Sequence, residues 1–143
     1  MSDNKKGRIL GLDYGRRRIG VAQSDPLNIV AQSLPTITVK NRDETVREIE
    51  QLVKKNSIVK VVVGMPLNLR GEKGVIAEEI SYFIQQLQET LKIPVIEWDE
   101  RMTSVAAKRT LHELGKSPSR NKSKVDQIAA LLILQNYLDY INR

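Results

Sequence analysis

The sequence predicts an α/β fold in which a mixed sheet of five strands, three antiparallel and then parallel, is flanked by helices. Three observations support this prediction. Three strand-like segments come first and are joined by short connections, which favours antiparallel pairing. Later strand-like segments alternate with segments of helical periodicity, and helical crossovers bring parallel strands side by side. Several strands are also almost continuously apolar, which is typical of strands covered on both faces.

The first three strands are expected at residues 8–15, 18–25 and 36–40. The first two are nearly unbroken apolar runs, and the basic pair Arg16-Arg17 forms a tight turn between them. The third strand is shorter. This part of the chain is therefore expected to fold as three neighbouring antiparallel strands.

The middle of the chain is expected to form a helix, a strand and a second helix. Asn41 is a suitable N-cap with Glu44 at the third helical position, which predicts a helix to about Asn56. The next strand is expected at 59–65, ended by Pro66, and the second helix at 75–91. Both helices carry their apolar residues on one stripe, so each is expected to pack on the sheet.

The C-terminal part is expected to hold a fifth strand at 95–98, a helix at 103–114, a polar linker at 115–124 and a last helix from 124 to about 141. There are no internal repeats. The length suits one domain over residues 1–143.

Three acidic residues occupy positions where apolar residues are expected. Asp13 ends an apolar strand, Glu100 follows the fifth strand, and Asp126 heads the last helix on the same face as Ala129 and Ala130. Parallel strands bring their C-terminal ends to one sheet edge, where ligands bind in open α/β folds. Carboxylates gathered there suit Mg²⁺ or Mn²⁺, and such ions act on phosphates. The sequence thus predicts a metal site that works on phosphate.

Each acid also has an ordinary structural interpretation. Asp13 could pair with an arginine of the Arg16-Arg17-Arg18 run, and Asp126 could close a capping box with Ser123. Glu100 could belong to a solvated strand end. The three together favour the metal site, because independent segments converge on one edge.

The charge balance predicts an anionic partner, nucleic acid above all. The chain has 23 Lys and Arg against 17 Asp and Glu, a net charge of +6 and a pI near 9.7. It has no cysteine, which excludes a thiolate metal site. Its one histidine, His112, falls on the helix expected at 103–114, where we expect a surface or hydrogen-bonded residue in preference to a catalytic base. No stretch resembles a signal peptide or a membrane span, so a cytoplasmic location without membrane association is expected.

Basic residues flank the predicted acidic edge and are candidate contacts to a phosphate backbone. They lie in the first turn, after Glu100 and before the last helix. They are Arg16, Arg17, Arg101, Lys116, Arg120, Lys122 and Lys124. A solvated loop is the alternative interpretation of the residues at 116–124.

Four motifs, in order along nearly the whole chain, resemble those of the YqgF (RuvX) family. They are Gly11-Leu12-Asp13-Tyr14-Gly15 with Arg18-Ile19-Gly20-Val21-Ala22 and Ser24-Asp25; Val62-Val63-Gly64-Met65-Pro66-Leu67-Asn68 with Gly71; Trp98-Asp99-Glu100-Arg101-Met102-Thr103-Ser104; and Lys124-Val125-Asp126 with Ala129-Ala130.

The resemblance implies an RNase H-like fold and a metal-dependent nuclease, with Asp13, Glu100 and Asp126 at the family's acidic positions. It implies processing of the 5′ end of pre-16S rRNA in ribosome biogenesis, or, by similarity to RuvC, resolution of Holliday junctions in branched DNA. The chain departs from the RuvC pattern at Ala129, where RuvC has a fourth acid. That departure puts a two-metal scheme in doubt.

Other interpretations of the sequence remain open. A junction resolvase needs two opposed active sites, yet no dedicated dimer seam is visible, so a monomer or weak homodimer is expected. An actin-like phosphate binder would need two such domains, and 143 residues hold one. A non-catalytic nucleic-acid-binding module would bind without turnover, but the intact acids disfavour it.

Overall fold

A computed structural model describes residues 7–67, 70–100 and 122–143. The predicted helix at 103–114 and most of the linker lie outside the described residues. Among the described residues, no helix is long and apolar enough to cross a membrane.

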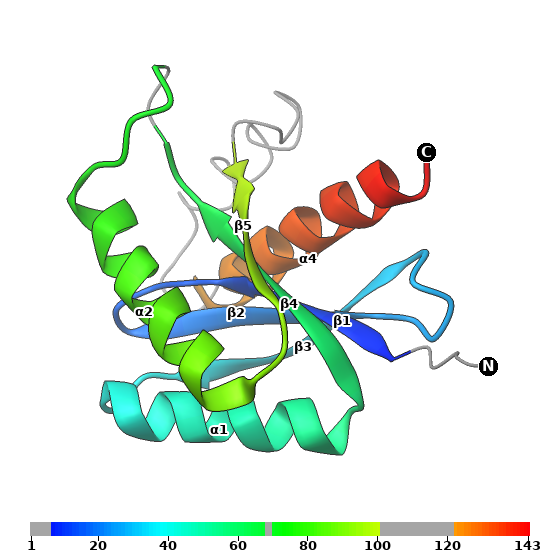
Figure 1. Cartoon of the computed structure of the whole chain (residues 1–143), viewed down its shortest axis with the longest axis horizontal. Helices are drawn as coiled ribbons and strands as arrows, with labels where there is room; N and C mark the ends of the chain where they lie inside the picture. The colour runs from blue at the N-terminus through cyan, green and yellow to red at the C-terminus, as the bar shows by residue number, and fades with distance from the viewer. Residues whose placement is uncertain (1–6, 68–69, 101–121) are drawn as a thin grey trace.

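The sheet has the predicted five strands in the spatial order β3-β2-β1-β4-β5 (Figure 1). The strands are β1 (Arg8–Asp13), β2 (Arg18–Ser24), β3 (Ala31–Thr38), β4 (Ile58–Met65) and β5 (Val95–Asp99). β1, β2 and β3 pair antiparallel, whereas β4 pairs parallel with both β1 and β5. The mixed topology predicted from the sequence is confirmed.

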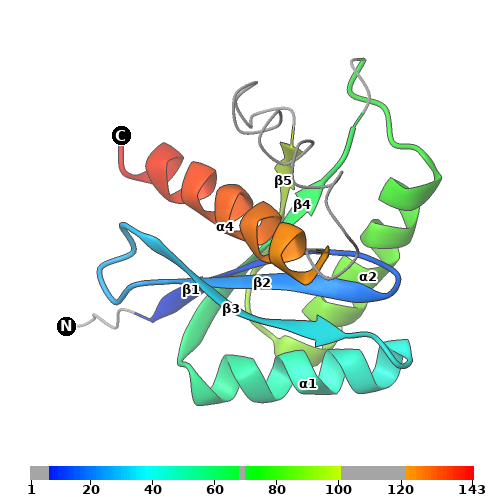
Figure 2. The ribbon, with the colours of Figure 1, turned by 180° about the vertical axis from the view of Figure 1, so that it is seen from behind.

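Three helices cover the sheet within the described residues. Helices α1 (Arg42–Lys55) and α2 (Val75–Leu91) lie on one face, and α4 (Lys122–Ile141) crosses the other, as Figures 1 and 2 show from opposite sides. α1 begins as predicted, because the Asn41 side chain accepts a hydrogen bond of 2.9 Å from the Glu44 N–H. α4 is described from Lys122 onward, so the last helix includes the two residues before its predicted start at Lys124.

The predicted third strand is wrong in its start and length. The sequence indicates residues 36–40, but β3 runs from Ala31 to Thr38 and contains Pro35. Proline is tolerated there because β3 is an edge strand, so the missing N–H removes no bond to a further strand. The register against β2 shifts beside it, since Ile19 pairs with Ile37 and Val21 with Leu34. One extra residue on β3 is thus accommodated as a bulge.

The two cores follow from strand alternation. Leu10 and Leu12 of β1 are fully buried under α1 and α2, whereas Ile9 packs with residues of α4. Alternate residues point to opposite faces, so Gly11 and Asp13 lie on the α4 face with Ile9. Asp13 therefore lies on the same side of the sheet as the core residues that α4 covers.

Glycines on the central strands let α4 approach the sheet backbone. A Cβ built at Gly20 would collide with the backbone carbonyl oxygen of Asp126, and one at Gly64 would lie 2.5 Å from Ile133 Cδ1. Only glycine leaves this space without moving the helix. Because Gly20 pairs with Asp13 in the β1–β2 ladder, the same approach brings the start of α4 beside the end of β1.

We expect Gly20→Ala to displace the N-terminal part of α4 and to lower the free energy of unfolding by about 1–3 kcal/mol, as overpacking does. The single tryptophan, Trp98, contacts Tyr137 and Tyr140 of α4, with ring centroids 5.5 Å apart in both pairs. Urea unfolding followed by Trp98 fluorescence measures the effect. Gly74→Ala is the control, because a Cβ at Gly74 meets nothing within 4 Å. Equal fluorescence and equal stability for Gly20→Ala and the wild type would contradict the close approach.

Candidate active site

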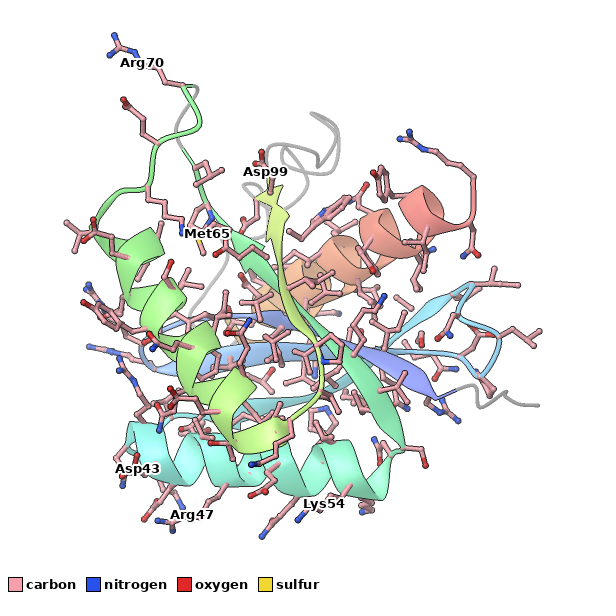
Figure 3. All side chains as sticks on the ribbon, viewed as in Figure 1. Asp43, Arg47, Lys54, Met65, Arg70 and Asp99 are labelled. Atoms are coloured by element: carbon pink, nitrogen blue, oxygen red, sulfur yellow. The ribbon has the colours of Figure 1, made fainter. Side chains whose placement is uncertain are left out.

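The three predicted acids lie near one another at one edge of the sheet, on the face covered by α4. Asp13 is the last residue of β1, and Glu100 directly follows β5. β4 lies between these strands and ends at Met65, which pairs with Asp99 (Figure 3). Asp126 is the fifth residue of α4. Two strand ends and one helix therefore supply one acid each.

The electrostatics show that the three carboxylates interact. Burial raises the pKa of Asp13 from 3.8 to about 7, and the nearby charges of Glu100 and Asp126 act on it in the same direction. Ionising Asp13 in this place is unfavourable both because water is partly excluded and because two like charges are close. A buried, perturbed carboxyl of this kind is typical of functional sites.

Gly64 provides the space in which Glu100 lies. A Cβ at Gly64 would be 2.8 Å from Glu100 Oε2. The Glu100 carboxylate thus approaches the backbone near the end of β4, between its own strand and β1. The glycine of the Val62-Val63-Gly64 motif therefore makes room for both α4 and the acid.

Asp126 is held by an arginine that the sequence pattern did not place. Its Oδ2 accepts a hydrogen bond of 2.7 Å from Arg18 Nε at the start of β2. Both side chains are partly buried, with 34% of the Arg18 surface and 22% of the Asp126 surface exposed. Sequence reasoning placed Arg18 in the basic first turn and considered it as a partner of Asp13. Strand alternation could have indicated otherwise, because Arg18 shares the α4 face with Gly20 and Ala22.

The ordinary interpretations of Asp13 and Asp126 receive no support from these contacts. Arg16 pairs with Glu79 of α2 at 3.0 Å, and Arg18 pairs with Asp126, so both arginines are engaged away from Asp13. Ser123 lies inside α4 instead of preceding it, so Asp126 is beyond the third helical position that a capping box requires. Ala130 and Ile133, which share its helical face, are buried.

The acids adjoin without converging to coordination distance. Among the described residues, no three Asp, Glu, His or Cys side chains come together in an arrangement that could hold a metal ion as they stand. The donor set itself suits a hard divalent cation, because all three acids offer carboxylate oxygens. A bound cation would also stabilise the ionised form of Asp13, which burial and the neighbouring acids disfavour.

The Arg18 contact leads to a prediction about metal affinity. Hydrogen-bond partners of ligating carboxylates typically contribute 10–100-fold to metal affinity or activity. We therefore expect Arg18→Gln to raise the metal concentration for half-maximal cleavage about tenfold. Metal titration of the cleavage rate measures this, with Arg47→Gln on the outer side of α1 as the control (Figure 3). A lowered metal requirement would instead show that Arg18 competes with the metal for Asp126.

The predicted basic contacts are only partly placed. Arg16 and Arg17 are exposed in the β1–β2 turn, and Lys124 is exposed in the first turns of α4, one turn or less from Asp126. Lys122 lies in α4. Arg101, Lys116 and Arg120 lie outside the described residues. The turn and the helix start therefore bring cations to the acidic edge from two directions.

Comparisons with known proteins agree with this arrangement. A family model described as RuvX, Holliday junction resolvase, matches residues 7–140. A protein of Acetivibrio thermocellus named "Putative pre-16S rRNA nuclease" is 49% identical over 134 residues, covering 92% of this chain and 95% of its own. A protein of Syntrophus aciditrophicus with the same name is 44% identical over 136 residues, covering 95% and 91%.

Solved structures with low sequence identity share the fold. RuvC of T. thermophilus in complex with a Holliday junction substrate matches with a TM-score of 0.59 at 16% identity, covering 95% of both chains. The Holliday junction resolvase of fowlpox virus matches with a TM-score of 0.53 at 17% identity, covering 93% of this chain and 99% of its own. The fold is thus RuvC-like, as the RNase H-like prediction requires, and the chain belongs to the RuvX family.

Proposed function

We propose that this protein is a divalent-metal-dependent endonuclease that hydrolyses phosphodiesters of precursor 16S rRNA and processes its 5′ end in the cytoplasm. The observation that carries the proposal is the grouping of Asp13, Glu100 and Asp126, in which burial and then the two neighbouring acids raise the pKa of Asp13 to about 7. The names of relatives at 44% and 49% identity support the rRNA substrate. We further propose that residues 1–143 work as one domain, as a monomer or weak homodimer.

In this proposal the three acids have one task, which is to hold Mg²⁺ or Mn²⁺. Asp13 is the central ligand because both neighbours act on it, and Glu100 and Asp126 complete the set. The cation, when bound, supplies charge stabilisation for the phosphate and a lower pKa for an attacking water. Arg18 keeps Asp126 oriented through the 2.7 Å contact and leaves its other oxygen available.

The basic residues would hold the RNA backbone beside this cluster. Arg16 and Arg17 in the β1–β2 turn and Lys124 on α4 are exposed side chains that we assign to this role. Arg101, Lys116, Arg120 and Lys122 are proposed for the same role from their place in the sequence. Contacts of this kind do not read sequence and weaken as salt rises. Binding of the rRNA is therefore expected to weaken steeply with ionic strength.

Resolution of Holliday junctions is the second candidate function. It is favoured by the description of the family model and by the fold shared with RuvC. Ala129 stands one helical turn from Asp126, where RuvC has its fourth acid, and this difference disfavours a RuvC-like reaction.

Cleavage of two substrates under the same conditions separates the candidates. The proposal predicts Mg²⁺- or Mn²⁺-dependent cleavage of a precursor 16S rRNA fragment at a position that maps to the mature 5′ end. It predicts little or no paired cleavage of a synthetic four-way DNA junction. Paired junction cleavage with intact rRNA would overturn the substrate assignment but keep the metal site. Binding of both substrates without cleavage of either, at any metal concentration, would identify a binding module.

A further inference from the structure

A second cavity lies on the opposite face of the sheet from the acids, at the same edge. It has a volume of about 180 Å³ and lies between the β1–β2 turn, α1 and α2. Its lining residues are Tyr14, Arg16, Ile19, Val39, Arg42, Thr45 and Phe83. Drug-sized ligands fill roughly 300–1,000 Å³, so this cavity suits a smaller group.

The cavity and the acids are linked through consecutive residues of the chain. Asp13 lies on the α4 face, whereas Tyr14 packs with the core under α1 and α2. Neighbouring Cα atoms are about 3.8 Å apart. The acids and the cavity thus lie on opposite sides of the end of β1, where the chain passes from Asp13 to Tyr14.

A buried hydroxyl in this cavity has no partner. Thr45 on α1 is 3% exposed and lines the cavity, and its Oγ1 makes no hydrogen bond to any described group. Buried polar atoms are nearly always hydrogen-bonded, and an unsatisfied one is costly. The Thr45 oxygen has almost no accessible surface, so a polar atom of a ligand in the cavity reaches it only where the cavity wall shifts.

The walls combine aromatic and cationic groups. The Tyr14 ring is partly exposed, with its centroid 4.9 Å from that of the fully buried Phe83 ring. Arg16 and Arg42 are exposed at the mouth, and Glu79 pairs with Arg16 at 3.0 Å. Aromatic faces beside cations bind single-stranded nucleic acid through stacking and phosphate contact.

We propose that this cavity binds one unstacked base of the substrate strand, close to the bond that is cut. The base stacks on Tyr14 and meets the Thr45 hydroxyl with a polar edge, while Arg42 contacts its phosphate. The site would favour single-stranded over paired substrate, because a paired base cannot enter. This inference rests on the proposed function and adds a subsite that selects unpaired RNA near the scissile phosphate.

The test is a scan with abasic nucleotides. A short single-stranded RNA that spans the processed 5′ end is made with one base removed at each position in turn. Its affinity for full-length Asp13→Asn protein is measured by fluorescence anisotropy, because this variant is expected to bind without cleaving. The proposal predicts one position at which base removal weakens binding at least about fivefold, as loss of a stacking contact does. A flat scan would overturn the subsite.

Variants of the lining residues then identify the cavity. In the Asp13→Asn background, Tyr14→Leu should reduce the loss of affinity caused by base removal at that position to less than about twofold. An unchanged loss of affinity would contradict binding of this base in the cavity. Thr45→Val and Arg42→Gln provide the test should Tyr14→Leu fail to fold. Each of these two substitutions should weaken the binding of intact RNA more than the binding of RNA that lacks the base at the sensitive position. Arg47→Gln, the control, should affect both RNAs equally. Equal effects of Thr45→Val and Arg42→Gln on both RNAs would overturn the proposal.

The outcome is distinguishable from failure of the proposed function. If the wild-type protein cleaves the rRNA fragment but no abasic position weakens binding, the base-binding proposal is wrong and the proposed function stands. If one abasic position weakens binding but the protein cleaves no RNA with any metal, the base-binding proposal stands and the nuclease assignment is wrong.

Discussion

We expect Asp13→Asn to abolish cleavage, with a loss in rate of at least about 10³-fold, comparable to the loss of other main electrostatic groups of active sites. The substitution keeps the size of the side chain but removes the charge on which the proposed metal site is centred. The fold and most of the RNA affinity should remain, because affinity comes from the basic residues. Single-turnover cleavage of the precursor fragment with saturating Mn²⁺ measures the effect.

Asp139→Asn is the matched control for this substitution. Asp139 is exposed near the C-terminal end of α4, far along the helix from Asp126, and its substitution should leave cleavage unchanged. RNA binding by Asp13→Asn within about twofold of the wild type would confirm that the charge acts in the reaction. Full activity of Asp13→Asn would remove Asp13 from the mechanism.

The second large effect is a dependence of stability on pH that a metal reverses. The pKa of Asp13 is about 7 in the folded protein and 3.8 in its ordinary state, so the folded state binds more protons between these values. The free energy of unfolding therefore decreases as the pH rises from about 4 to about 7. One pKa unit corresponds to about 1.4 kcal/mol, and allowing for partial solvent access we expect a loss on the order of 2 kcal/mol.

Asp13→Asn separates this contribution from the other titrating groups. The variant carries no charge at residue 13, so it should be more stable than the wild type at pH 8 and should lack this loss between about pH 4 and 7. Adding Mg²⁺ or Mn²⁺ at pH 8 should stabilise the wild type and not the variant, because only the wild type binds the ion. Urea unfolding at about pH 4, 6 and 8, with and without metal, measures both effects. Identical dependences of the free energy of unfolding on pH for the two proteins would show that the pKa of Asp13 is not raised in the folded state.

Much of the fold was predictable because its signals are local. The Asn41 cap, the apolar runs of β1 and β4 and the periodicity of α2 each determine one element, and α2 has the bounds that its sequence predicts. The length of β3 was not predictable in this way. Whether a strand tolerates Pro35 depends on whether it lies at the sheet edge, and this is a property of the whole sheet.

The candidate site was predictable in its acids and not in their surroundings. Asp13, Glu100 and Asp126 stand out because each is an acid beside buried apolar residues, and strand order then brings them to one edge. The Arg18 contact to Asp126 joins residues 108 positions apart, so only the packing of α4 on β2 reveals it. The role of Gly20 is hidden for the same reason, since its neighbour is the Asp126 backbone.

The most direct test of the three-acid site is a crystal structure of the wild-type protein grown with Mn²⁺ and measured at the manganese absorption edge. We expect an anomalous peak bound by carboxylate oxygens of Asp13, Glu100 and Asp126, at distances of about 2.0–2.2 Å. The same experiment on Asp13→Asn should show no peak there. A peak elsewhere, or the same peak in both proteins, would contradict the claim that these acids form a metal-dependent nuclease site centred on Asp13.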